Sequence, residues 1–286
     1  MKKFTIALLS FFALPTAIQA NIDPKVAEIC MKATDFEGCV KSMSGQTNKN
    51  SSRVSSKYDE ALIFFEAGDT SSAMKKINSF IKDNNSSKEA YLARGIIYSY
   101  DLMENEKAMD DFNKAIEIDD QYAIAYALRA DHLYWELGNA SQAKKDIEKA
   151  YKLSPQDTYV NLARGNILLD YAYVLLDKNK NDLAISNAKS SITSFEQVIS
   201  DKNPEKNLII KRLFPFGVTY EAHSYLGDAN FDILYTAYKK NGDRIGAKQY
   251  LKDSINHYTN AIAIAPSQEE SEKYEIERDF DMITLA

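Results

Sequence analysis

The sequence predicts an all-α protein, built as a solenoid of antiparallel helix pairs, and three observations support this fold class. Glycine and proline are scarce, with ten and six among 286 residues, so the turn signals of short strands are few. Apolar residues recur at helical spacing, as in the stretch AMDDFNKAIEID at 108–119. Several columns of residues also return at a constant step of 35, a period typical of repeat architectures.

Five columns of residues carry the 35-residue step. The motif LARG occurs at Leu92–Gly95 and again at Leu162–Gly165, and LRAD at Leu128–Asp131 lies midway between them. Each unit also holds turn residues between two helical stretches, so one unit corresponds to one helix pair. The columns are Ala73, Ala108 and Ala143; Phe80, Ala115 and Ala150; Arg94, Arg129 and Arg164; Tyr91 and Tyr126; and Asp111 and Asp146.

The first twenty residues differ from the repeat region. Two lysines precede an apolar run from Phe4 to Ala17, and the small-residue end AIQA closes at Ala20. This pattern predicts a secretory signal peptide over residues 1–20. Because Asn21 follows in place of a cysteine, no lipid anchor of the lipoprotein type is expected. No later run is long enough to span a bilayer, so we expect no membrane insertion after signal removal.

The charge of the chain argues against a nucleic-acid partner. The net charge is −6, and removing residues 1–20, which hold two lysines and no acid, makes it −8. The basic residues are dispersed, without a run of five or more. Nucleic-acid backbones require a positive surface, which such a chain does not offer.

Cys30 and Cys39 are the two cysteines of the chain. Export and an even count favour a disulfide between them, within a small helical hairpin over 21–44. A redox pair is the alternative, although redox cysteines usually stand two residues apart. Residues 45–52 are polar and are expected to link this hairpin to the repeats. The stretch DPKVAEICMKATDFEGCVKSMSG resembles an N-terminal module of exported cyanobacterial proteins, which implies a compartment and no reaction.

Residues 53–157 are expected to form standard helix pairs. Turn residues divide the two helices of each pair, and acidic or proline residues end the second helices. A small residue on each first helix fits a place where two helices cross closely. The divisions fall at Gly68-Asp69, Glu104-Asn105 and Gly138-Asn139, the ends at Asp119-Asp120 and Pro155, and the small residues at Gly95, Ala130 and Gly165.

Residues 158–266 carry the same motif in stretched form. In the standard unit 13 positions separate the small residue of the first helix from the alanine of the second, whereas the next two units have 19 and 20. Each first helix has therefore gained about two turns. We expect two elongated hairpins, at about 158–204 and 219–266, joined by EKNLIIKRLFPFG. Residues 267–286 are expected to hold a capping helix, whose apolar set is Tyr274, Ile276, Phe280 and Ile283.

The order of residues within a unit resembles the tetratricopeptide repeat. An aromatic, a small residue and a tyrosine on the first helix precede alanine, an aromatic, alanine and proline on the second. The resemblance is clear over about 88–157 and weaker over 53–87. It implies a right-handed superhelical solenoid whose first helices line a concave groove, and a scaffold or adaptor that binds a protein or peptide segment there.

Applied to this chain, the groove rule selects aromatic residues and carboxylates on the first helices. Trp135 is the only tryptophan, and tryptophan and tyrosine are favoured anchors at interfaces. The alternative is that the aromatic residues fill space between repeats and the aspartates are solvated. These positions lack the Lys, Asn and Arg set with which some tetratricopeptide domains hold a C-terminal carboxylate. The candidate partner-binding residues are Tyr100, Asp131, Tyr134, Trp135, Asn166, Asp170, Asp228, Phe231 and Asp232.

The arginine column favours a structural role over ligand binding, which is the alternative. An aspartate stands 17 residues after Arg94 and after Arg129. Two antiparallel helices can bring such positions together, so Arg94–Asp111 and Arg129–Asp146 are expected as structural ion pairs.

Motifs of catalysis and cofactor binding are missing from the sequence. It contains no GxSxG, GxGxxG, HExxH or phosphate loop, and His132, His223 and His257 have no partner at metal-ligand spacing on one helix. We therefore expect no enzyme activity, no metal and no cofactor.

Two other functions compete with the protein-binding scaffold. One is a small-molecule or glycan-binding protein with a pocket between the elongated hairpins, lined by Tyr171, Tyr173, Tyr235 and Tyr238. The other is self-association through the capping helix. Export is expected for all three, with the periplasm favoured and the thylakoid lumen or the extracellular space as alternatives.

Overall fold

A computed structural model describes residues 57–204, 208–214 and 217–285. The expected signal peptide, the cysteine hairpin with Cys30 and Cys39, and the polar linker lie outside the described residues. All regular secondary structure within the described ranges is helical, which confirms the predicted all-α class. None of the helices described there combines the length and apolar character that a membrane span requires.

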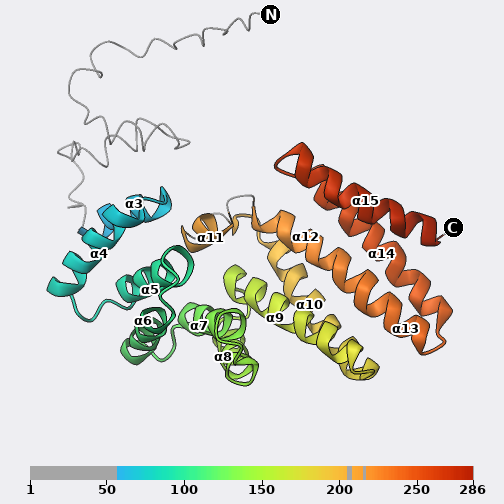
Figure 1. Ribbon diagram of the computed structural model, residues 1–286, viewed down its shortest axis with the longest axis horizontal. Helices are drawn as coiled ribbons and strands as arrows, with labels where there is room; N and C mark the ends of the chain where they lie inside the picture. The colour runs from blue at the N-terminus through green and yellow to red at the C-terminus, as the bar shows by residue number, and fades with distance from the viewer. Residues whose placement is uncertain (1–56, 205–207, 215–216, 286) are drawn as a thin grey trace, which may run out of the picture.

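Antiparallel helix pairs follow one another along an arc from the blue N-terminal end to the red C-terminal end of the described chain (Figure 1). The first helix of each pair packs on its second, and neighbouring pairs stack. The pairs are α3 (Lys57–Glu66) with α4 (Thr70–Asp83); α5 (Lys88–Ile96) and η1 (Ile97–Asp101) with α6 (Asn105–Ile118); α7 (Ala123–Trp135) with α8 (Ala140–Leu153); α9 (Thr158–Asp177) with α10 (Asn181–Ser200); and α12 (Val218–Asp228), η3 (Ala229–Tyr235) and α13 (Thr236–Lys240) with α14 (Arg244–Ala263).

The last two pairs are elongated, as the stretched spacing predicts. Helices α9, α10 and α14 each have 20 residues, whereas α6 and α8 have 14. The first helix of the last pair runs without a break from Val218 to Lys240, through the π-helical segment η3.

The small residues of the first helices lie where an aromatic ring meets the backbone. A Cβ atom at Gly165 would lie 2.4 Å from Phe195 Cε1, and one at Gly227 would lie 2.3 Å from Tyr258 Cε1. One unit has Ala130 in place of the glycine. The position that faces it, which is aromatic in the units that have glycine, holds the smaller Ile147, and both residues are fully buried. Helix crossing therefore fixes a small–large pair in each unit.

Each arginine of the column joins neighbouring helices. Arg129 donates from Nε to Asp146 Oδ2 at 2.7 Å and from Nη2 to Asp146 Oδ1 at 2.9 Å, and from Nη1 to Asn113 Oδ1 at 2.7 Å. It thereby ties its own helix α7 to α8 and to α6 of the preceding unit. The same contacts recur one unit earlier among Arg94, Asp111 and Asn78.

Arg164 has different partners, because the elongated unit places Ser194 before the ring of Phe195, where the standard unit has Asp111 before Phe112. Its Nε donates to Glu148 Oε1 at 3.1 Å and its Nη1 to Ser194 Oγ at 2.8 Å. The three arginines are thus held within the fold, and none of them lines the pocket described below.

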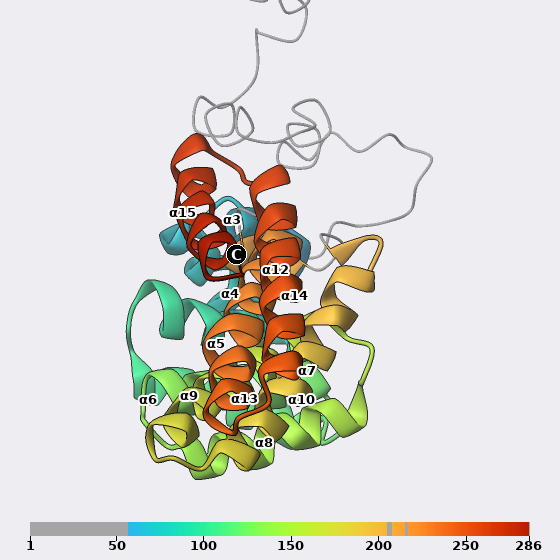
Figure 2. The ribbon, with the colours of Figure 1, turned by 90° about the vertical axis from the view of Figure 1, so that its right-hand side faces the viewer.

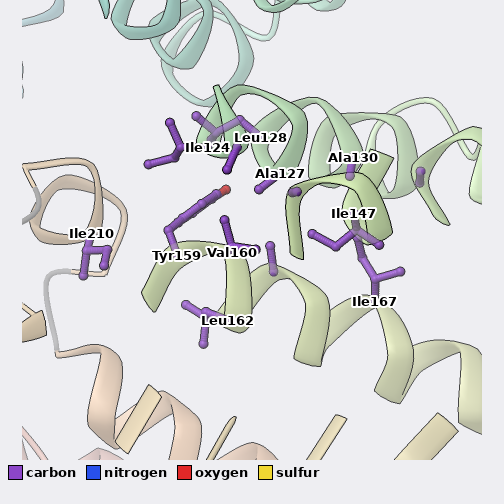
Figure 3. Close-up of a cluster of buried hydrophobic side chains, with 14 of the residues drawn as sticks. Ile124, Ala127, Leu128, Ala130, Ile147, Tyr159, Val160, Leu162, Ile167 and Ile210 are labelled. Carbon is purple, nitrogen blue, oxygen red and sulfur yellow. The ribbon is translucent and has the colours of Figure 1, made fainter. Parts of the chain in front are cut away.

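The connector between the elongated hairpins turns back into the arc. It contains α11 (Leu208–Leu213), which lies on the inner side of the arc near α3 (Figure 1). Arg212 Nη2 donates to Asp101 Oδ1 at 2.6 Å, so this short helix is tied to the second unit. Ile210 belongs to the same buried cluster as Tyr159 and Leu128 (Figure 3).

Helix α15 (Gln268–Leu285) packs along α14 at the C-terminal end (Figure 2). Tyr274 is buried, and its ring lies 5.6 Å from that of Tyr220. The predicted apolar covering set is wrong in part, because Ile276 and Phe280 are 71% and 57% exposed. The facing side of α14 is polar at Ser254, whose hydroxyl donates to the buried Asp281. The buried face of α15 therefore combines Tyr274 with Asp281 and leaves Ile276 and Phe280 largely exposed. Ile283 lies among the side chains left undescribed.

Candidate functional site

A pocket of about 370 Å³ lies between the first helices of four successive units and the connector α11. Because α11 stands on the inner side of the arc, the pocket belongs to the concave face (Figure 1). Its volume is at the lower end of the range of small-ligand sites, which is enough for one long side chain or a small molecule. We call it the inner pocket, and it is lined by Tyr100, Asp131, Trp135, Asn166, Leu169, Asp170, Tyr173, Leu213, Phe214, Tyr225 and Asp228.

The inner pocket brings together six of the nine candidate residues: Tyr100, Asp131, Trp135, Asn166, Asp170 and Asp228. Tyr134, Phe231 and Asp232 do not line it. Sequence reasoning missed Leu213 and Phe214, since their place depends on the connector turning back, for which the sequence holds no periodic signal.

The tyrosines expected for a small-molecule pocket are not gathered in one place. Tyr173 lines the inner pocket, whereas Tyr235 lines a second pocket that also contains Lys239 and Arg244. Tyr238 packs against Tyr250 instead, with ring centroids 4.9 Å apart.

Tyrosine–aspartate hydrogen bonds connect the first helices of successive units along the inner wall. Each tyrosine hydroxyl donates to a carboxylate of the next first helix, and hydrogen bonds to a charged acceptor are short and strong. Burial raises the pKa of Tyr134 and of Tyr173, so both hydroxyls keep their protons and remain donors at neutral pH. The pairs are Tyr100–Asp131 at 2.6 Å, Tyr134–Asp170 at 2.5 Å and Tyr173–Asp232 at 2.6 Å.

Asp131 accepts hydrogen bonds from three side chains. In addition to Tyr100, the indole Nε1 of Trp135 donates to Oδ1 at 3.0 Å and the hydroxyl of Tyr159 donates to Oδ2 at 3.4 Å. Burial raises the pKa of Asp131, and these three hydrogen bonds act in the opposite direction. Trp135 is 49% exposed, so its indole is held by Asp131 while much of its ring remains open to a ligand.

Asp228 lies at the other side of the pocket, on α12. Tyr258 donates to its Oδ1 at 2.7 Å. Burial raises the pKa of Asp228 to about 7, and the negative charges of Asp232 and Glu277 act in the same direction. Part of this carboxyl is therefore protonated at neutral pH, and a bound cation would favour its ionised form.

Histidines that stand isolated in the sequence meet partners in the fold. Ser99 Oγ lies 2.7 Å from His132 Nδ1, and His132 Nε2 lies 3.3 Å from the carbonyl oxygen of Asn105. Ser99 and His132 are 4% and 2% exposed, so this contact packs the interior and offers no nucleophile to a substrate. In the described part of the chain, no group of three or more His, Cys, Asp or Glu side chains has an arrangement that could hold a metal ion.

A second contact, between α12 and α14, joins His223 and His257, whose Nδ1 atoms are 3.2 Å apart. Burial lowers the pKa of His257 to about 4, and the neighbouring His223 acts in the same direction, while Asp253 opposes it. The ordinary value is 6.5. Because the folded-state pKa is the lower one, the stability gained from neutral His257 is complete above pH 6.5 and is lost as the pH falls towards 4.

We expect acid to destabilise the protein partly through this pair. Between pH 7.5 and 5, the melting temperature of the wild type should fall a few degrees further than that of His257→Gln, which cannot be protonated there. Circular dichroism melts of the two proteins at matched ionic strength measure the difference. Parallel curves of melting temperature against pH would contradict it.

The fold and the inner pocket define a class of protein: an all-α repeat solenoid with an aromatic and acidic recess in its concave wall. The model of the tetratricopeptide repeat matches two of its units, at residues 88–122 and 123–157. These two units form the part of the inner wall that carries Tyr100, Asp131 and Trp135.

Solved structures with similar folds are remote in sequence. The crystal structure of MamA is 17% identical, with a TM-score of 0.43, and the match covers 68% of this chain and 91% of that one. For PilW, described as a widely conserved type IV pilus biogenesis factor, the identity is 19%, the TM-score 0.42 and the coverage 78% and 99%. For yeast Tom70 the values are 14%, 0.38, and 93% and 66%. Comparison with curated protein sequences gives no match.

Proposed function

We propose that the protein is a non-catalytic scaffold or adaptor that binds a segment of a partner protein on its concave face, with the inner pocket at the centre of that surface. The observation that carries the proposal is the convergence of aromatic and carboxylate side chains from four successive first helices on one recess. In a repeat solenoid the concave wall is the usual binding surface, and a partly exposed tryptophan in a recess is a favoured anchor point.

Export belongs to the same proposal. It rests on the charged and apolar pattern of residues 1–20 and on the even number of cysteines. An exported scaffold would meet its partner in the periplasm, with the thylakoid lumen and the extracellular space as alternative compartments.

A small-molecule binder is the second candidate. It is favoured by the connector, which places Leu213 and Phe214 against the pocket and gives it a wall that a simple open groove would lack. The pocket volume of about 370 Å³ suits a small ligand as well as a single side chain.

The proposal is tested by selecting peptides from a random displayed library against the immobilised full chain. Peptides that bind the groove should lose at least about 30-fold in affinity when Trp135→Ala removes the exposed anchor, as expected for an interface hot spot. Isothermal calorimetry with the wild type and the variant measures the loss.

Leu137→Ala is the matched control. Leu137 is 45% exposed, close to the 49% of Trp135, and it does not line the inner pocket. The control should bind within about twofold of wild type, because changes outside hot spots are nearly neutral. Selected peptides that bind the Trp135 variant as tightly as the wild type would refute the groove.

A further inference from the structure

The inner pocket is negatively charged and aromatic. Three of its lining residues are aspartates and five are aromatic, whereas no described lining residue is a lysine or an arginine. The aromatic residues are Tyr100, Trp135, Tyr173, Phe214 and Tyr225. Faces of such rings attract cations, most strongly when water is excluded.

The aspartates of the pocket have neutral donors only. Asp131 receives hydroxyl and indole hydrogen bonds, Asp170 receives the hydroxyl of Tyr134, and Asp228 receives that of Tyr258. Among the described residues, no lysine, arginine or histidine lies within 4.0 Å of any of these carboxylates. Neutral donors fill some of the hydrogen-bonding positions of each carboxylate but do not compensate its charge. A half-buried charge without a counterion is unfavourable, because it has lost part of its hydration.

Asn166 adds an unused acceptor to the same pocket. Its Oδ1 is shielded from solvent and has no hydrogen-bond partner within the described chain. No hydrogen bond from its Nδ2 to a described residue fixes the orientation of the amide, and a turn of about 180° would present the oxygen to the pocket. With the amide turned, its oxygen could accept from an entering donor, while the Nδ2 group takes the shielded place.

The chain itself shows which side chain fits this combination of groups. Arg129 pairs with the carboxylate of Asp146, donates to the amide oxygen of Asn113 and lies over the ring of Tyr126 at 5.4 Å. One unit earlier the same set of an aspartate, an asparagine oxygen and a tyrosine ring surrounds an arginine again. The inner pocket presents this set, aspartates with Asn166 and tyrosine rings, and none of the described arginines lies among them.

We propose that the inner pocket binds an arginine side chain of the partner segment, with its guanidinium group between Asp170, Asp228 and the amide oxygen of Asn166. This assignment rests on the proposed function and names the chemistry that its central pocket selects. Arginine fits better than lysine, because its planar group has five donors for several acceptors and stacks on aromatic faces. A lysine offers one compact charge to the same acceptors, so we expect it to bind more weakly.

Trp135 provides a direct readout, because it is the only tryptophan of the chain and lines the pocket. The full chain is titrated with Nα-acetyl-arginine amide and with Nα-acetyl-citrulline amide, which has nearly the same shape and no charge, while the indole Nε1–H resonance is followed. The arginine compound should give a saturable shift, and the citrulline compound should bind at least about tenfold more weakly, as expected for the loss of a charge-assisted hydrogen bond.

Two variants locate the charge and one serves as a control. Asp170→Asn and Asp228→Asn should each lower the affinity for the arginine compound at least about tenfold. Glu196→Gln removes the same charge from an exposed position of α10, outside the pocket, and should change the affinity by less than about twofold. Circular dichroism melts show whether each variant is folded at the temperature of the titration.

The second arm uses the peptides selected in the test of the proposed function. Those that depend on Trp135 should share an arginine at a fixed position, and its replacement by citrulline should weaken binding at least about tenfold. Peptides that depend on Trp135 but tolerate citrulline would overturn the arginine assignment and leave the scaffold function intact. Saturable binding of the free arginine compound without any Trp135-dependent peptide would overturn the assignment to a partner protein and favour a small cationic ligand.

Discussion

Replacing Arg129 with methionine is expected to lower the free energy of unfolding by about 3–5 kcal/mol. The change leaves the carboxylate of Asp146, whose side chain is 5% exposed, without the two hydrogen bonds and the charge that compensate its burial. It also removes the contact to Asn113 that holds the preceding unit. Urea unfolding followed by circular dichroism measures the loss.

A double variant separates the unpaired charge from the loss of packing. Arg129→Met combined with Asp146→Leu removes both charges, and it should recover at least about 2 kcal/mol relative to the single variant. As a control, Lys114→Met breaks the exposed pair with Glu117 and should change stability by less than about 1 kcal/mol. An Arg129→Met protein as stable as the Lys114→Met protein would show that the arginine column does not hold the units together.

Replacing Gly165 with alanine should destabilise the protein by about 2 kcal/mol. The added Cβ atom would lie 2.4 Å from Phe195 Cε1, which is far inside van der Waals contact, and the ring is fully buried and stacked on Tyr225. The overpacking cost of about 3 kcal/mol is partly offset by the roughly 1 kcal/mol by which alanine favours a helix over glycine, which leaves the net loss of about 2 kcal/mol. Thermal and urea unfolding measure the net effect.

A second substitution tests the cause of this effect. Gly165→Ala with Phe195→Ile reproduces the alanine–isoleucine pair that the chain uses at Ala130 and Ile147. The two changes together should cost less than the sum of their separate costs, because the smaller isoleucine on one helix makes room for the larger alanine on the other. Strict additivity would mean that the glycine is not required by the ring. Thr193→Ala, at an exposed position of α10, should stay within about 0.5 kcal/mol of wild type.

The repeat pattern is the part of this protein that local sequence decides. Columns at a step of 35 predict the helix pairs, and the stretched gaps predict the elongated pairs. Both predictions succeed because helical periodicity, and the close crossing of a small residue with a large one, depend only on segments that are neighbours in the sequence. The inner position of Tyr100, Asp131 and Trp135 follows from the same regularity, since equivalent residues of a repeat face the same way.

The sequence alone could not decide which residues complete the pocket. Leu213 and Phe214 reach it because Arg212 ties α11 to Asp101, 111 positions earlier in the chain. His223 and His257 likewise come together only because helix α12 packs on helix α14. Such contacts have no period, because they depend on where distant segments come to lie once the solenoid has curved.

The sequence by itself therefore determined the type of architecture and the face on which six of the candidate residues gather. Tertiary structure decided that aspartates on this face accept hydrogen bonds from tyrosine hydroxyls. It also decided that the arginines of the first helices, Arg94 and Arg129, pair with aspartates of the second helices, Asp111 and Asp146. The physical reason is that local spacing fixes the direction of a side chain, whereas its hydrogen-bond partner is fixed by the packing of helices that are distant along the chain.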